Sequence, residues 1–165
     1  MNEPATGELW KLAPIIKVYE ALGALGDGRY ELGDNTARVF SSRGNKAYDV
    51  RYDSARNAIM ANDNGSYWQG YLGYPGIVLL LALDKVPYDP RLPQVLKGFA
   101  WQDINQQFKN DFAKTQQYVD TEVVLKSGLE LRELHDLVEA VQRAVYALQL
   151  RKLGKRQKPP TEFED

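Results

Sequence analysis

The chain of 165 residues contains no cysteine and only one histidine, His135. The absence of cysteine excludes disulfides, thiol catalysis, and zinc or iron–sulfur centres held by cysteine. At helical spacing from His135 the sequence offers one further ligand, the carboxylate of Glu139, and a helical metal site normally needs more than these two groups. With one histidine and no G-x-S-x-G turn, no Ser-His-Asp arrangement is marked either. We therefore expect no metal, no cofactor and no nucleophilic catalysis.

Long apolar runs and an excess of either charge are also missing. The longest strictly apolar run, Ile77–Leu83, has seven residues, against the ~20 that cross a bilayer. Residues 1–20 do not combine a basic start with an uninterrupted apolar stretch, so they do not read as a secretory signal, and we expect a cytoplasmic protein without a membrane partner. Lysine and arginine number 21 against 22 aspartate and glutamate, so the formal charge of −1 gives no overall attraction to nucleic acid.

The residues that are present predict one globular α+β domain over residues 1–154 and a mobile charged tail over 155–165. Hydrophobic residues make up 44% of the chain, and 10 tyrosines and 3 tryptophans favour an aromatic-rich core. A chain of this length buries a substantial core without disulfides or metals. Beyond Gly154, the tail has two prolines and no apolar periodicity.

The first half of the chain predicts a helix followed by a β-meander. Apolar residues recur at helical spacing from Leu12 to Leu25 and stop at Gly26-Asp27-Gly28. Between Arg29 and Ala61, short β-type runs alternate with turn residues, which predicts three or four antiparallel strands. In KAYDVRY apolar and charged residues alternate, as expected of a sheet that packs on one face only.

The second half predicts helices only. Pro75–Leu83 is apolar all round and is typical of a buried central helix that begins with proline. Three prolines follow, with room for one short helix through Val95 and Leu96. Trp101–Lys126 lacks glycine and proline and predicts one long helix, which Ser127-Gly128 ends. A last helix carries Leu131–Leu148, and the two form an antiparallel helical hairpin.

The stretch Asn62–Gly76 is the candidate functional loop because glycines and aromatic residues gather there before a helix. Gly70, Gly73 and Gly76 lead into a helix N-terminus, where unpaired N–H groups attract anions. These glycines match neither a P-loop nor a G-x-G-x-x-G motif, so the preferred interpretation is a tight loop around which aromatic side chains pack. The candidate binding residues in this loop are Trp68, Tyr71, Gly73 and Tyr74.

Two further surfaces are candidates for partner binding. A basic cluster near the C-terminus has the charge to contact a nucleic-acid backbone or an acidic protein, although no aromatic residue interleaves with it. It consists of Arg151, Lys152, Lys155, Arg156 and Lys158. The apolar seam of the last helix serves either the intramolecular hairpin or a homodimer, because a/d spacing does not say which chain supplies the partner helix. The seam consists of Leu131, Leu134, Val138, Val141, Val145 and Leu148.

The middle of the chain reads VFSSRGNKAYDVRYDSARNAIMANDN and, after a loop, GYPGIVLLLAL. This order of parts resembles the SWIM-type zinc-binding module, in which a hairpin is followed by Cys-x-Cys, a turn, and Cys-x-His before an apolar helix. The resemblance covers residues 39–83. The shared parts are Val39, Ser41 or Ser42, Gly44, Tyr48, Val50 and the helix Ile77–Leu83.

By position, the two ligand pairs of that module fall near Ile59 and Ala61, and near Tyr74 and Gly76, none of which is a zinc ligand. The resemblance therefore implies a version that has lost every metal ligand, with packing by Ile59, Tyr67, Trp68 and Tyr74 in the place of zinc. It further implies at most a role in binding nucleic acid or protein.

From these patterns we expect a non-enzymatic interaction module that contacts a protein or nucleic-acid partner through the aromatic glycine-rich loop and the basic C-terminal segment. The alternative is a small enzyme or ligand-binding protein that holds an anionic small molecule at the Gly70–Gly76 loop and helix N-terminus. Arg38, Arg51 or Lys46 would then supply the opposite charge from the sheet. An enclosed pocket lined by convergent polar groups at Asn62–Gly76 would favour the alternative.

Overall fold

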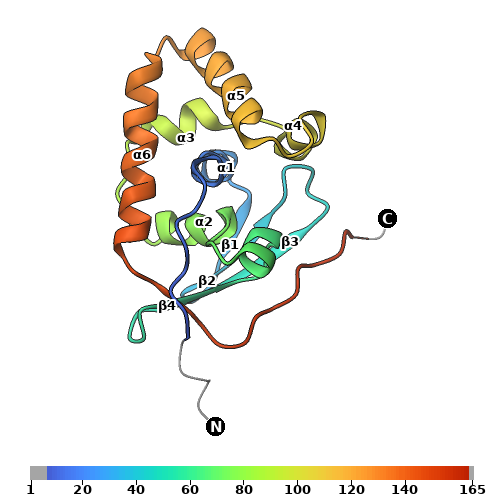
Figure 1. Cartoon of the computed structure of the whole chain (residues 1–165), viewed down its shortest axis with the longest axis vertical. Helices are drawn as coiled ribbons and strands as arrows, with labels where there is room; N and C mark the ends of the chain where they lie inside the picture. The colour runs from blue at the N-terminus through green and yellow to red at the C-terminus, as the bar shows by residue number, and fades with distance from the viewer. Residues whose placement is uncertain (1–6, 164–165) are drawn as a thin grey trace.

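The computed structural model describes residues 7–163 and shows the predicted α+β architecture (Figure 1). One face of a sheet is covered by α2 (Tyr74–Ala82), and α1 (Ile15–Asp27) lies beyond α2, further from the sheet. An outer helical layer surrounds α1. It consists of α3 (Arg91–Leu96), α4 (Trp101–Gln107), α5 (Phe112–Ser127) and α6 (Leu131–Ala147).

The predicted antiparallel meander is confirmed. It runs through β1 (Tyr30–Leu32), β2 (Thr36–Phe40), β3 (Ala47–Asp53) and β4 (Ala58–Ala61), in that spatial order. In β3, Tyr48 and Val50 are buried whereas Asp49 and Arg51 are exposed, so the sheet packs on one face, as predicted.

A fifth strand was not predicted. Residues Arg151–Lys152 form β5, which pairs with β4 in parallel and completes the order β1-β2-β3-β4-β5. The N-terminal segment joins the same edge, because the Trp10 N–H donates to the Leu150 carbonyl at 3.0 Å and the Trp10 indole donates to the Ile59 carbonyl at 3.0 Å. The N-terminal segment and the residues that follow α6 therefore meet beside β4.

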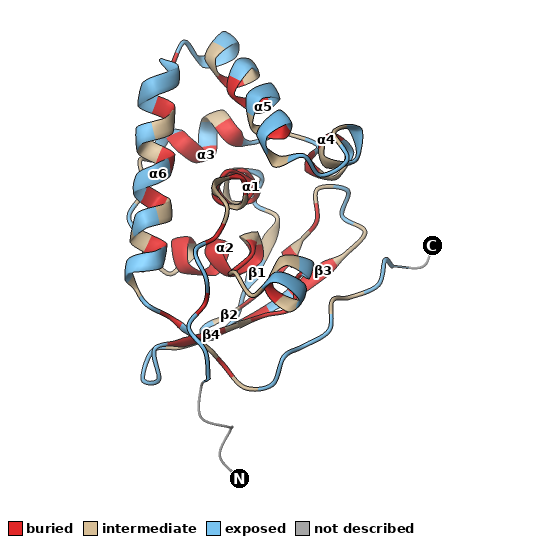
Figure 2. Cartoon of the chain, in the orientation of Figure 1, coloured by how far each residue is buried: buried red, intermediate tan, exposed pale blue. Residues whose placement is uncertain are grey.

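The two central helices follow from their sequences. Pro14 precedes α1, and Gly28 ends it in the left-handed conformation with a φ of 69°. Proline stands in the first turn of α2, whose residues 75–81 are all buried, as predicted for a helix that is apolar all round. Figure 2 shows that buried residues concentrate on α1, on α2 and on the facing side of the sheet. The core therefore lies between the sheet and the outer helices.

The prediction of one long helix over Trp101–Lys126 is wrong. The chain leaves the helix after Gln107, because Lys109 and Asn110 adopt positive φ angles of 53° and 61°. Asp111 then caps α5, its side chain accepting from the Lys114 N–H at 3.2 Å. The break turns α4 out of line with α5, toward the tip of the β2–β3 hairpin (Figure 1).

The last helix and its seam lie as predicted for the intramolecular hairpin. A tight turn at Gly128 joins α5 to α6, and α6 contacts α1 and α3 as well as α5. Four seam residues are buried in the chain's own core, namely Leu134, Val138, Val141 and Val145. Leu131 is exposed and Leu148 is half-buried. These four side chains are therefore already covered, and a homodimer through them stays an untested prediction.

Candidate functional site

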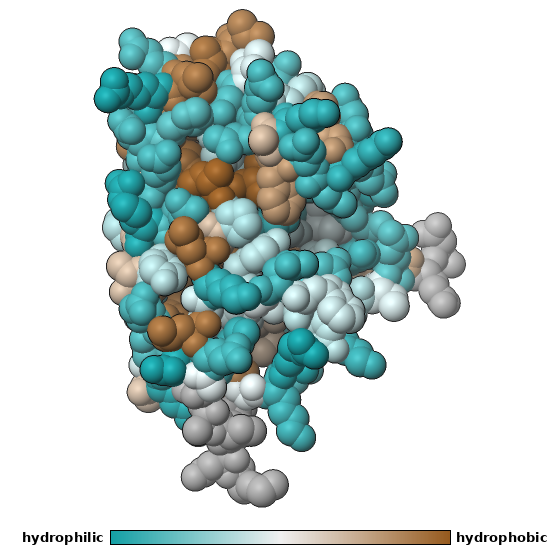
Figure 3. Space-filling model, in the orientation of Figure 1, coloured by the Kyte–Doolittle hydropathy of each residue, from teal (hydrophilic) through white to brown (hydrophobic). Residues whose placement is uncertain are grey.

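A cleft of about 420 Å³, lined by many polar and charged side chains, lies between α1, the β2–β3 hairpin, α4 and the segment that follows β4. That segment contains a short π-helix, η1 (Gly65–Gln69), which was not predicted and which the Gly70 N–H closes by donating to the Gly65 carbonyl at 3.1 Å. In the space-filling view the surface is hollowed between the helices above and η1 below (Figure 3). The cleft thus lies on the candidate loop Asn62–Gly76.

A buried carboxylate, Asp63, forms part of the cleft wall behind η1. Its Oδ1 accepts from the Ser66 hydroxyl at 2.5 Å and its Oδ2 accepts from the Ser66 N–H at 3.2 Å. The Gly73 N–H in turn donates to the Ser66 hydroxyl at 3.0 Å. Only glycine fits at position 73, because a Cβ there would lie 1.7 Å from Asp63 Oδ2. Burial raises the pKa of Asp63, against the lowering effect of the Ser66 hydrogen bonds and of Lys17.

The glycine-rich loop does not leave the N-terminus of α2 free of other groups. The Gly73 N–H, at the N-cap of α2, already donates within the chain, and the carboxylate packed against that glycine is the chain's own Asp63. A carboxylate of the chain itself therefore lies beside this helix N-terminus. Any external ligand has to be held by the side chains that line the cleft.

Lys17 and Glu20 of α1 contribute an ion pair to the cleft. Lys17 Nζ lies 3.5 Å from Glu20 Oε1, and the Asn105 amide donates to the same oxygen at 3.2 Å. Lys17 also lies over the Phe112 ring, 5.0 Å from its centroid. Burial lowers the pKa of Lys17, but the charges of Glu20, Tyr71 and Asp63 outweigh it and raise that pKa overall, so Lys17 stays protonated.

Three tyrosines from separate segments line the same cleft. Tyr48 comes from β3, Tyr71 from the loop after η1 and Tyr74 from α2, and the rings of Tyr48 and Tyr74 meet edge to face at 5.9 Å. Within residues 7–163 none of the three hydroxyls has a hydrogen-bond partner. Burial raises the pKa of all three, that of Tyr48 to about 12, so all are neutral donors at physiological pH.

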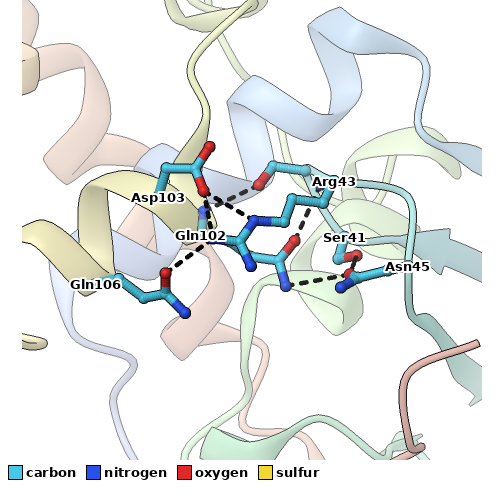
Figure 4. A network of polar contacts seen from close by, with 7 residues as sticks. Ser41, Arg43, Asn45, Gln102, Asp103 and Gln106 are labelled. Atoms are coloured by element: carbon cyan, nitrogen blue, oxygen red, sulfur yellow. Dashed lines mark hydrogen bonds and ion pairs between the residues drawn. The ribbon is translucent and has the colours of Figure 1, made fainter.

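The opposite wall is held by a polar network between the β2–β3 hairpin and α4 (Figure 4). Arg43 donates through Nε to Asp103 at 2.8 Å and through Nη2 to Gln106 at 2.8 Å. Gln102 accepts from the Arg43 N–H at 2.9 Å and donates to the Asn45 side chain at 3.2 Å. This wall depends on the break before α5, because a continuous helix would not carry α4 to the hairpin.

The predicted loop residues do meet at the cleft. Trp68, Tyr71 and Tyr74 line it, with Trp68 65% exposed at the rim, while Gly73 lies behind Asp63. Of the three cations expected from the sheet, Lys46 lines the cleft, whereas Arg38 and Arg51 lie on the open outer face.

The predicted basic cluster does not gather at the cleft. Arg151 donates to the Gly7 carbonyl at 2.9 Å and Lys152 pairs with Glu8 at 3.1 Å, both at the β5 edge of the sheet. Lys155 is exposed, and Arg156 lies over the Tyr67 ring at 4.3 Å. Arg156 therefore lies beside the candidate loop, and so does Lys152, whose Nζ would lie 3.3 Å from a Cβ at Gly70.

Lys17 and Glu20 were missed as site residues because the periodicity of α1 accounts for the helix without them. The signal was two opposite charges three residues apart, on a stretch whose other residues between Ile15 and Leu25 are apolar, aromatic or glycine. Among residues 7–163 no group of three or more His, Cys, Asp or Glu side chains is placed to hold a metal ion.

The positions matched to the SWIM ligands are filled by packing. Ile59 and Ala61 are buried in β4, and Gly76 lies in α2 against Leu72. The resemblance to that module remains a prediction.

Fold and site together define an α+β protein with a polar cleft between its sheet and its helices. Residues 10–151 match the family described as uncharacterised conserved protein UCP014422, and the chain belongs to that family. Neither a curated protein nor a solved structure matched the chain. No helix within residues 7–163 is both long enough and apolar enough to span a membrane.

Proposed function

We propose that this protein binds a small anionic molecule rich in hydroxyl groups in the cleft between α1, η1 and the β2–β3 hairpin. The proposal rests on the polar side chains of the cleft that have no hydrogen-bond partner within the described chain. Two carboxylates of the cleft, Glu20 and Asp63, are satisfied within the chain, by Lys17 with Asn105 and by Ser66 respectively, and the third, Glu162, lies on the C-terminal segment at the edge of the cleft. The groups without a partner in the described chain are mainly donors.

These donors come from the β2–β3 hairpin, from the segment that follows β4 and from α2. They are the Lys46 amine, the Trp68 indole N–H, and the hydroxyls of Tyr48, Tyr71 and Tyr74. A cation together with several N–H and O–H donors matches a phosphate or carboxylate group. The volume of about 420 Å³ lies within the range of small-molecule sites.

The cleft also holds carboxamides whose side chains make no hydrogen bond within the described chain, on Asn64, Gln69 and Asn110. A carboxamide both donates and accepts, as a ligand hydroxyl does, so these groups suit a hydroxyl-bearing molecule. Sugar phosphates and sugar acids combine both features. They are the class that we expect to bind.

A thermal-shift screen tests the proposal. The panel contains inorganic phosphate, citrate, sugar phosphates and sugar acids, with neutral sugars, polyamines and short nucleic acids as comparisons. A ligand at 100 times its Kd stabilises the native state by about 2.7 kcal/mol, which a melting curve resolves. The stabilisation should fall in Lys46→Gln and Tyr74→Phe and persist in the matched control Arg38→Gln, on the outer face. A panel in which only polyamines or nucleic acids stabilise the protein contradicts the proposal.

The interaction module expected from the sequence is a second candidate, favoured by one observation. Trp68 is 65% exposed at the rim, where an aromatic side chain is a typical anchor for a partner. In that case Trp68→Ala abolishes binding to a captured partner while Tyr74→Phe, within the cleft, leaves it unchanged. The cytoplasmic location likewise remains a prediction.

A further inference from the structure

The C-terminal segment, residues 155–163, runs from β5 past η1 to the β2–β3 hairpin and forms no helix or strand (Figure 1). Two anchors hold it. Near its start, Arg156 lies over the Tyr67 ring at 4.3 Å and donates to the Tyr67 carbonyl at 3.3 Å. At its end, the Phe163 N–H donates to the Asn45 carbonyl at 2.7 Å.

The anchor residues Tyr67 and Asn45 belong to two elements whose neighbouring residues line opposite walls of the cleft. Tyr67 belongs to η1 and meets Trp68, at the cleft rim, edge to face at 4.5 Å. Asn45 belongs to the hairpin wall and accepts from Ser41 and Gln102. Between the anchors the segment places Glu162 at the cleft. A chain segment thus bridges the cleft from one wall to the other.

We propose that residues 155–163 form a strap that closes the side of the cleft between η1 and the hairpin and opens to exchange ligand. Its hold is weak enough for this, since an exposed cation–π contact and single hydrogen bonds are each small contributions. Glu162 adds selectivity, because its carboxylate repels an anion near the cleft while the strap is closed. The role in ligand exchange rests on the proposed function, whereas closure itself is testable without a ligand.

Closure is tested by the reactivity of one thiol in the cleft. The chain has no cysteine, so Ser42→Cys, on the hairpin wall, introduces a single reactive group. We expect its reaction with dithionitrobenzoate, a dianionic disulfide, to be about three- to tenfold faster when Arg156→Ala is added, by loss of one strap anchor. Glu162→Gln should speed the dianionic reagent but not a neutral thiol reagent, since it changes charge alone.

A matched control places the thiol on the outer sheet face, as Arg38→Cys, where Arg156→Ala should leave the rate unchanged. A second measurement follows the amide of Phe163 in the otherwise unmodified chain, whose hydrogen exchange should accelerate in Arg156→Ala because the strap releases. Equal rates at Ser42→Cys with and without Arg156→Ala, together with unchanged exchange at Phe163, overturn the strap.

Anion binding by the strap variants is measured separately from closure. Arg156→Ala and Glu162→Gln should each enlarge the thermal shift given by inorganic phosphate or citrate, because a closed fraction of the protein reduces apparent affinity. If the thiol reacts faster but no anion of the panel stabilises any variant, the strap stands and the anion-binding function fails. If anions stabilise the wild type, Arg156→Ala and Glu162→Gln equally and the thiol rates are equal, the function stands and the strap fails.

Discussion

At the scale of single residues, the cleft is built around a carboxylate kept away from water. Asp63 is 6% exposed, and its side chain accepts from both the hydroxyl and the N–H of Ser66. Fully buried carboxyl groups of this kind are uncommon and cluster at functional sites. The residue therefore links the stability of the fold to the chemistry of the cleft.

The raised pKa of Asp63 predicts how stability varies with pH. A carboxyl whose pKa is higher in the folded than in the unfolded chain stabilises the fold below its unfolded pKa of ~3.9 and loses that contribution as the pH rises through the folded pKa. Each pH unit of this window corresponds to about 1.4 kcal/mol. Asp63→Asn removes the titration, so its free energy of unfolding should gain on that of the wild type as the pH rises from 4 to neutrality.

Urea unfolding at several pH values measures this difference. Asp34→Asn, on the exposed turn between β1 and β2, serves as the matched control and should follow the wild type. A constant offset between Asp63→Asn and the wild type across the range would show that Asp63 does not titrate differently in the folded chain.

At the scale of elements, α1, α5 and α6 are joined by a buried polar chain. The Tyr19 hydroxyl donates to Asp120 Oδ1 at 2.5 Å, and His135 Nε2 lies 2.7 Å from Asp120 Oδ2. Burial, followed by the hydrogen bond to Asp120, raises the pKa of Tyr19, which keeps the hydroxyl protonated as a donor. His135, which the sequence offered as a metal ligand beside Glu139, is instead paired with a carboxylate from the neighbouring helix.

Tyr19→Phe should cost about 1–2 kcal/mol of unfolding free energy, because it removes one partner of a buried acceptor while conserving the ring. Chemical denaturation gives the value. Tyr118→Phe, on the exposed side of α5, removes a hydroxyl without a buried acceptor and should change the unfolding free energy little.

The cap that begins α5 after the break should contribute to the stability of the fold. Asp111→Ala removes the side chain that caps α5, at a cost of about 1 kcal/mol. Asp136→Ala, exposed within α6, is the comparison and should cost less. A loss as large in Asp136→Ala as in Asp111→Ala would mean that the cap does not stabilise α5.

The elements that the sequence predicted have a strong apolar period. The elements that it missed are short. Periodicity predicted α1, the meander and α2, but a period continues across a break when the residues on both sides fit it, as Ile104, Phe108 and Phe112 do. The local signal was Lys109-Asn110-Asp111, a left-handed turn followed by an N-cap. Strand β5 depends on a distant partner, β4, which no local window contains, whereas η1 is closed by hydrogen bonds within residues 63–73 that leave no apolar period.

The candidate site was predicted in part for the same reason. Aromatic residues near glycines marked Trp68, Tyr71 and Tyr74, which do line the cleft. Lys17 and Glu20 lie far away in sequence, and their contribution follows only from the packing of α1 against the loop after β4. The packing of Asp63 against Gly73, at the N-terminus of α2, could likewise not be predicted, because it requires the turn of η1.

For the molecule as a whole, the seam of α6 bears on whether the protein is a monomer or a homodimer. Leu134 is fully buried against the chain's own helices, so Leu134→Ala should cost about 2–5 kcal/mol. If these side chains serve only the intramolecular hairpin, the melting temperatures of the wild type and of this variant should both be independent of protein concentration. Leu131→Ala, which is 47% exposed, is the matched control. A melting temperature that rises with concentration and loses this dependence in Leu134→Ala would restore the dimer.

The pairing of β5 with β4 has a consequence for how the chain is made. Synthesis begins at the N-terminus, so β1 to β4 exist long before Leu150 and Arg151 are added. Until then the β4 edge presents unpaired N–H and C=O groups, which are a template for pairing with other chains. The nascent protein therefore exposes an unpaired edge of β4 while α2 to α6 are synthesised. Strand β5 covers this edge when it pairs with β4.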